Sequence, residues 1–180
     1  MLIEQIRKLP SFRRDARGTA AIEFAGAGML LAVGLLNAVD FGYYMYQRME
    51  VENAAQVGAQ VAWKTCSQSS MLPATQNCAG LNAAVTTAIQ STTLGSAVTL
   101  VSGYPTEGYY CVNASNQLQS VGSVTSSEPT DCSAAGNANT SPGDYLQIKV
   151  TFAYAPMFGI TVMGVSGITS ISKTSWMRLS

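Results

Sequence analysis

The stretch from Phe24 to Tyr46 reads FAGAGMLLAVGLLNAVDFGYYMY, and its 23 residues contain one charged side chain, Asp40, and one amide, Asn37. As an α-helix with a rise of about 1.5 Å per residue, it is about 34 Å long, enough to cross a hydrocarbon core of about 30 Å with some tilt. A buried core helix of a soluble protein is the alternative, which the length and the flanks disfavour. We therefore predict a transmembrane helix at residues 19–46.

The two flanks of this helix differ in charge. The whole chain holds 10 Lys plus Arg against 10 Asp plus Glu, yet residues 1–18 hold five basic and two acidic side chains, a net charge of +3. Residues 47–180 hold five basic and six acidic side chains, a net charge of −1. The positive-inside rule then places the N-terminus in the cytoplasm and residues 47–180 outside the membrane.

A cluster of tyrosines, Tyr43, Tyr44 and Tyr46, lies at the outer end of the apolar stretch. Amphipathic rings favour the membrane–water interface, so this cluster supports the same orientation. Asp40 is expected near this interface, where water would hydrate its carboxylate.

A secretory signal peptide is an alternative interpretation of the basic and apolar N-terminal pattern. Its apolar core would be Leu30–Leu36, and Ala32 and Gly34 would supply the small residues for cleavage. Cleavage there would fall inside the apolar run rather than after it, which disfavours this alternative.

A different cleavage site precedes the apolar stretch, in the run Gly18-Thr19-Ala20-Ala21-Ile22-Glu23-Phe24. This run resembles the processing site of type IV prepilins, where a membrane prepilin peptidase cuts after the glycine. The resemblance implies that residues 1–18 are a leader that is removed and that Thr19 becomes the N-terminus. It also implies that Glu23 and Phe24 serve processing and assembly, with Glu23 pairing with the Thr19 amine of a neighbouring subunit. The alternative for Glu23 is an interfacial acid that reaches water.

Three motifs carry a wider resemblance: Gly18-x-x-Ala21-Ile22-Glu23-Phe24-Ala25, Asp40-Phe41-Gly42-x-x-x-Tyr46 and Asn53-Ala54-Ala55-x-x-Gly58-Ala59-x-x-Ala62. With Tyr154-Ala155-Pro156 and a closing segment that reaches Met177-Arg178, they resemble the TadE/TadG-like family, pseudopilins of the bacterial Tad (Flp) pilus machinery. The resemblance implies an inner-membrane protein with a periplasmic domain. The implied partners are the prepilin peptidase, other pilin-like subunits and the inner-membrane assembly platform, besides the lipid bilayer itself.

Small residues recur every four positions along the helix, as Gly34, Ala38 and Gly42 and again as Ala54, Gly58 and Ala62. Residues four apart share one helix face, and small side chains there let a second backbone approach closely. We interpret the first set as a packing stripe for other pilin-like subunits, although Gly and Ala are also simply common in membrane helices. The second set is expected to pack on the protein's own sheet.

The external part is predicted to be α+β and pilin-like, a helix followed by an antiparallel sheet. No helix breaker occurs between Thr19 and Trp63, so one continuous helix of about 45 residues is expected. Further elements follow from the spacing of apolar residues: a helix at 80–91 and strands near 97–102, 108–112, 145–154 and 168–178. Residues 113–143 are expected to be mostly loop by composition.

All four cysteines, Cys66, Cys78, Cys111 and Cys132, fall in the external part. In an oxidising compartment an even number indicates disulfides, and four cysteines allow three pairings. We favour Cys66–Cys78 and Cys111–Cys132, because each closes one polar loop. The spacings contain no Cys-x-x-Cys pair and the chain has no His, which argues against a zinc site.

No pattern of enzyme chemistry stands out, and no metal or cofactor is expected. The absence of His removes Ser–His and Cys–His pairs, and neither a phosphate-binding glycine loop nor a basic surface for nucleic acid is present. We therefore predict a structural role, a minor pseudopilin for assembly of a Tad pilus. The alternative is an uncleaved, signal-anchored periplasmic or surface binding module for adhesion.

Overall fold

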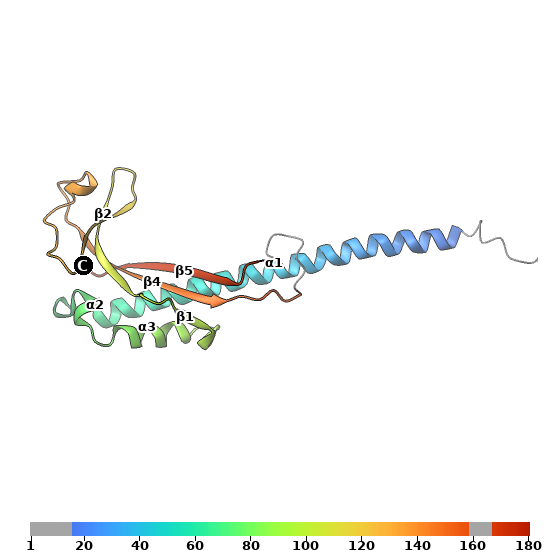
Figure 1. Ribbon diagram of the computed structural model, residues 1–180, viewed down its shortest axis with the longest axis horizontal. Helices are drawn as coiled ribbons and strands as arrows, with labels where there is room; N and C mark the ends of the chain where they lie inside the picture. The colour runs from blue at the N-terminus through green and yellow to red at the C-terminus, as the bar shows by residue number, and fades with distance from the viewer. Residues whose placement is uncertain (1–15, 159–166) are drawn as a thin grey trace, which may run out of the picture.

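The computed structural model describes residues 16–158 and 167–180 as a long N-terminal helix that continues into a small antiparallel sheet domain (Figure 1), which confirms the α+β prediction. Most of the predicted leader, residues 1–15, lies outside the described residues. The helices are α1 (Ala16–Cys66), α2 (Ala74–Asn77) and α3 (Leu81–Gln90), and the strands are β1 (Val98–Leu100), β2 (Thr106–Val112), β3 (Leu118–Ser123), β4 (Gly143–Ala153) and β5 (Ser170–Arg178).

Helix α1 is continuous over 51 residues and is therefore about 77 Å long. It includes the whole predicted helix from Thr19 to Trp63 and extends three residues beyond it at each end. Its first half projects away from the domain, and its second half lies along the sheet (Figure 1). One chain segment thus serves both as a free helix and as part of a core.

Strand β4 is the centre of the sheet and pairs antiparallel with three strands. Strand β5 pairs with one edge of β4, from Tyr145↔Arg178 to Ala153↔Ser170. Strands β1 and β2 share the other edge one after the other, since Val98 pairs with Phe152 and Thr106 with Gln147. The sheet is therefore three strands wide around β4, with β3 added outside β2.

Strand β3 was missed by the sequence analysis, which expected residues 113–143 to be mostly loop and predicted no strand there. Residues Leu118–Ser123 read LQSVGS, without the alternation of polar and apolar residues that marks a half-buried strand. None of these six residues is buried. Backbone pairing with β2 therefore forms this strand, a cause that hydrophobic periodicity does not report.

The main core lies between one face of the sheet and the two helices α1 and α3. Alternate residues of β4, Leu146, Ile148 and Val150, are fully buried against it, as the period of two predicts. Helix α3 contributes Val85 and Ile89 to the same core. Helix α1 contributes mostly alanines, which let it lie close to the sheet: Ala54, Ala55, Ala59 and Ala62.

Candidate processing and assembly region

The predicted processing site lies in the first turns of α1. The Gly18–Thr19 peptide bond lies near the N-terminal end of the described part of α1. Residues 18–24 are all exposed, and Phe24 keeps 81% of its accessible surface. A Cβ built on Gly18 would meet no atom within 4 Å. Among the described residues, none therefore covers this bond.

Glu23 lies one helical turn after Thr19 and is exposed. Residues four apart share a helix face, so an amine at Thr19 and the Glu23 carboxylate would lie on the same side of α1. This arrangement supplies a cation and an anion for contacts between subunits once the chain is cut after Gly18. Their pairing between subunits remains a prediction.

The two sets of small residues have different surroundings. A Cβ built on Gly34 or Gly42 would meet nothing within 4 Å, whereas one built on Gly58 would lie 2.9 Å from Ile89 Cγ2 and 3.4 Å from Ile148 Cγ2. Gly58 therefore permits the close approach of α1 to α3 and β4. This confirms the prediction that the second set packs on the protein's own sheet.

Gly34, Ala38 and Gly42 lie in the part of α1 that projects away from the domain, which we call the bare half of the helix. Gly34 and Ala38 border a shallow groove with Asn37 and Phe41, and Phe41 is 48% exposed. The described part of the chain covers neither Gly34, Ala38 nor Gly42. The groove is thus available to a second helix.

Asp40 corrects the expectation of a hydrated carboxylate. Its side chain is only 2% exposed, and its Oδ1 atom accepts hydrogen bonds from the backbone N–H groups of Met157 at 2.9 Å and Phe158 at 3.0 Å. Its Oδ2 atom is buried without a hydrogen-bond partner among the described residues. The sequence around Asp40 could not predict its burial, because the donors lie more than a hundred residues further along the chain.

Part of the tyrosine cluster packs between α1 and the sheet domain. Tyr43 and Tyr44 are half-buried and pack on Tyr154 at the end of β4, with ring centroids 6.1 and 5.4 Å away. Tyr46 is 48% exposed. Two of the three rings that we assigned to the membrane interface therefore also belong to the junction between helix and domain.

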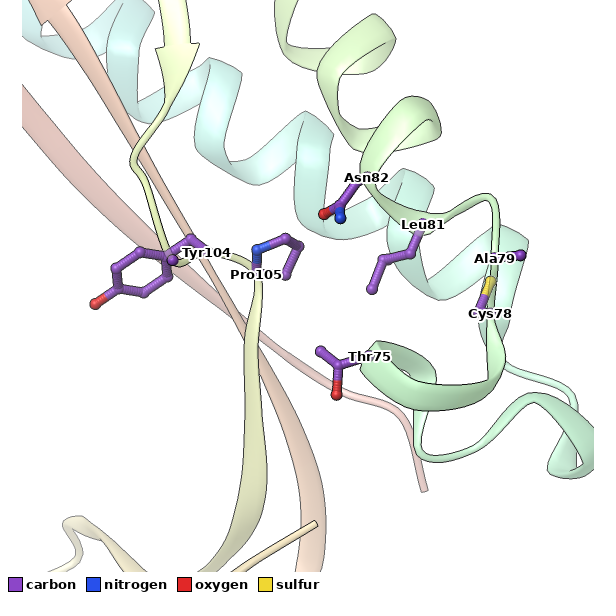
Figure 2. A pocket seen from close by; sticks show the side chains of 8 residues that line it. Thr75, Cys78, Ala79, Leu81, Asn82, Tyr104 and Pro105 are labelled. Atoms are coloured by element: carbon purple, nitrogen blue, oxygen red, sulfur yellow. The ribbon is translucent and has the colours of Figure 1, made fainter. Parts of the chain in front are cut away.

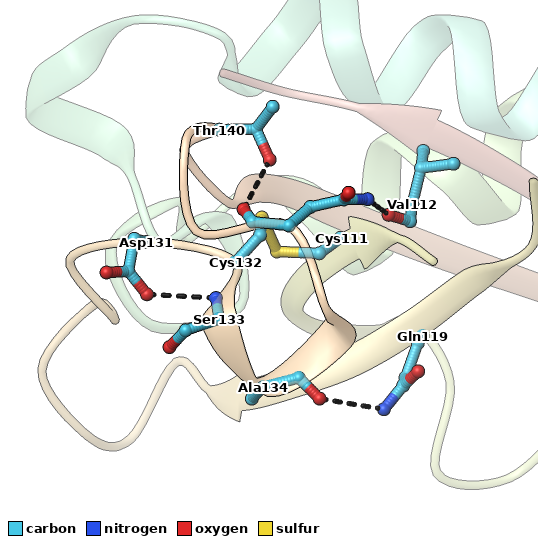
Figure 3. Close-up of a disulfide and its surroundings, with 9 residues drawn as sticks. Cys111, Val112, Gln119, Asp131, Cys132, Ser133, Ala134 and Thr140 are labelled. Carbon is cyan, nitrogen blue, oxygen red and sulfur yellow. Dashed lines mark hydrogen bonds between the residues drawn. A yellow bond between two sulfur atoms is a disulfide. The ribbon is translucent and has the colours of Figure 1, made fainter. Parts of the chain in front are cut away.

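Both disulfides have the predicted pairing. Cys66–Cys78 ties the end of α1 to the turn before α3, within the main core. Cys111–Cys132 ties β2 to the 3₁₀ turn at 133–135 and forms a second small core with Ala135 (Figure 3). Around it, Asn137 donates to the Val112 carbonyl, so side-chain hydrogen bonds hold this polar loop in place.

A hollow of about 330 Å³ lies between the start of α3 and the turn from β1 to β2 (Figure 2). Its lining is uncharged: Thr75, Cys78, Ala79, Leu81, Asn82, Gly103, Tyr104 and Pro105. Hydroxyl and amide groups could bind a neutral ligand there, but the lining offers neither a general base nor a metal-binding carboxylate. Across the described ranges, no group of His, Cys, Asp or Glu is arranged to hold a metal ion.

An acidic cluster across β2 and β4 escaped the sequence analysis. Asp144 is 3% exposed, and its burial, together with the negative charges of Glu107 and Glu128, raises its pKa to about 7. Glu107 accepts hydrogen bonds from the N–H groups of Ala74 and Thr75, both at 2.7 Å, at the start of α2. Strand pairing brings Glu107 and Asp144 together, whereas Glu128 follows β3 outside the strands, so the sequence spacing of these acids gave no sign of the cluster.

Within the described residues, one helix is long and apolar enough to cross a membrane, and its most apolar window has a mean hydropathy of 1.8 and is unburied. These features fit a membrane-anchored α+β protein whose candidate spanning helix continues into a disulfide-bonded domain. The family model of TadE-like proteins matches residues 18–60, which confirms the resemblance seen in the sequence and links the chain to the Tad pilus machinery. Comparison with curated proteins and with solved structures gave no match.

Proposed function

We propose that this protein is a minor pseudopilin of a Tad pilus, with a structural rather than a catalytic role. In this proposal, α1 anchors it in the bacterial inner membrane with its N-terminus in the cytoplasm and its sheet domain in the periplasm. The prepilin peptidase cuts between Gly18 and Thr19. The mature subunit then joins other pilin-like subunits at the inner-membrane assembly platform.

The observation that carries this proposal is the bare N-terminal half of α1. Its apolar side chains are exposed, with Ile22 at 74% and Leu30 at 77%, and its small residues border a groove that the described chain leaves open. In lipid, helices associate through close packing at small residues. A helix that begins at a processing site and keeps its apolar surface uncovered fits a subunit that exchanges lipid for neighbouring helices.

The experiment compares Gly18→Leu with Gly26→Leu in a host that has the prepilin peptidase. Both glycines lie in α1, and a Cβ at either meets nothing within 4 Å, so we expect both variants to fold. A branched side chain at the cleaved bond would obstruct the peptidase cleft, so Gly18→Leu should accumulate as a membrane protein heavier by residues 1–18. Gly26→Leu should be processed normally.

The retained leader also predicts an assembly defect. Its five basic residues are too costly to draw into lipid, so uncut Gly18→Leu should fail to enter pili. Glu23→Ala should be cut but should assemble poorly, because the partner for the Thr19 amine is lost. If the wild-type protein is as heavy as Gly18→Leu, the uncleaved, signal-anchored binding module becomes the better account.

A further inference from the structure

Asp40, which binds the β4–β5 connection, lies near the outer end of the predicted membrane-spanning residues 19–46. Seventeen positions separate Asp40 from Glu23, the other acidic residue of the apolar region, which places them about 26 Å apart along the helix. A hydrocarbon core is about 30 Å thick. At least one of the two carboxylates must therefore lie inside the hydrocarbon core of an average bilayer, unless the membrane thins.

The surroundings of the two carboxylates decide which of them lies deeper. Glu23 is exposed on the cytoplasmic end of the helix, where the predicted basic leader adjoins the membrane surface. Asp40 is 2% exposed and takes two backbone hydrogen bonds from Met157 and Phe158. A charged group in lipid is costly unless the protein provides partners, and Asp40, whose Oδ1 has two donors, is better provided with them than the exposed Glu23.

The donors must lie at the same depth as Asp40. The side chains of the two residues that donate these bonds are apolar and exposed, Met157 at 57% and Phe158 at 47%. Phe41, next to Asp40 on the helix, is 48% exposed as well. In water, these side chains would be apolar surface that no described residue covers, whereas acyl chains would cover them.

We propose that Met157 and Phe158 insert into the outer leaflet of the bilayer, so that the domain holds the membrane at a second point besides α1. Asp40 positions this contact by binding the backbone of both residues. The occupant of this apolar surface is lipid, because the surface continues the membrane-spanning part of α1. This inference rests on the membrane anchoring in the proposed function and adds a fixed orientation of the domain on the membrane surface.

The test places one tryptophan at a time in the full chain, in which Trp63 and Trp176 are first replaced by Phe. Phe158→Trp, Phe41→Trp and Val112→Trp are reconstituted in phosphatidylcholine vesicles whose acyl chains carry bromine near the glycerol end. Val112 is 46% exposed at the far end of β2 and is the matched control for an exposed apolar position. Bromine quenches tryptophan emission only on contact.

We expect Phe158→Trp to lose emission to the same extent as Phe41→Trp, while Val112→Trp keeps its emission. Asp40→Leu should abolish the quenching of Phe158→Trp and leave that of Phe41→Trp intact, whereas Asp40→Asn, which keeps the accepting Oδ1, should preserve both. Quenching of Phe41→Trp without quenching of Phe158→Trp would overturn the inference and leave the anchoring intact. Absence of quenching at both positions would contradict the anchoring itself.

Discussion

At the scale of single residues, Gly58 fixes how closely α1 approaches the rest of the domain. We predict that Gly58→Ala destabilises the domain, since the added carbon would lie 2.9 Å from Ile89 Cγ2 in a filled core. Overpacking of this kind costs about 1–3 kcal/mol, against a gain in helix propensity of up to about 1 kcal/mol.

Gly42→Ala is the control for this prediction, because it gives the same gain in propensity and its new Cβ meets no atom within 4 Å. Thermal unfolding in the same detergent should show a lower midpoint for Gly58→Ala than for Gly42→Ala. Equal midpoints would mean that the close approach at Gly58 contributes nothing to stability.

The raised pKa of Asp144 predicts that the stability of the domain depends on pH. Its pKa is raised from 3.8 to about 7 in the folded chain, so the folded state binds this proton more tightly than the unfolded state. The resulting stabilisation is complete below about pH 4 and is lost as the pH rises through about 7. Each pKa unit corresponds to about 1.4 kcal/mol, so the free energy of unfolding should fall by up to a few kcal/mol over this range.

Urea unfolding at a series of pH values between 5 and 8 measures this effect. Asp144→Asn removes the ionisable group at nearly the same size and should flatten the profile. Hydrogen bonding and the charge of Lys173 lower the pKa of Glu52, and hydrogen bonding with Ser133 lowers the pKa of Asp131. Both carboxyl groups therefore change their charge at lower pH than Asp144. An unchanged slope in Asp144→Asn would assign the pH dependence to other groups.

At the scale of elements, the two disulfides hold different parts of the domain. Cys66–Cys78 lies in the main core, whereas Cys111–Cys132 holds the polar loop outside β2. On the chain-entropy model, each stabilises the folded chain by about 3 kcal/mol.

We predict that amide hydrogen exchange distinguishes the roles of the two disulfides. Replacing Cys111 and Cys132 by Ala should raise exchange in β3 and leave α3 and β4 protected, because that disulfide does not touch the main core. Replacing Cys66 and Cys78 by Ala should raise exchange in α3 as well. Equal exchange profiles for the two double variants would contradict this division.

The sequence predicted the elements whose cause is local and missed those whose cause is tertiary. The apolar run and the absence of helix breakers located α1, and the spacing of apolar residues located α3 and β4. Strand β3 was missed, because it depends on pairing with β2. The contacts of Asp40 and the cluster around Asp144 were also missed, since both join residues far apart in the chain.

At the scale of the whole molecule, several contacts make α1 and the domain one mechanical unit. Asp40 binds the β4–β5 connection, Tyr43 and Tyr44 pack on Tyr154, and Glu52 forms a 2.9 Å salt bridge with Lys173 of β5. Among the described residues, no such contact with the domain is seen for the bare half of α1 before Asp40. A force on the bare half of the helix would therefore move the domain with it, as the proposed assembly into a pilus requires.

The central claim is that this helix begins at Thr19 in the mature protein. The most direct measurement is the intact mass, with N-terminal sequencing, of the wild-type protein purified from the membranes of a host with an active prepilin peptidase. We predict a chain that begins at Thr19 and still contains both disulfides. A chain that retains any part of residues 1–17 at its N-terminus would contradict the assignment as a pseudopilin.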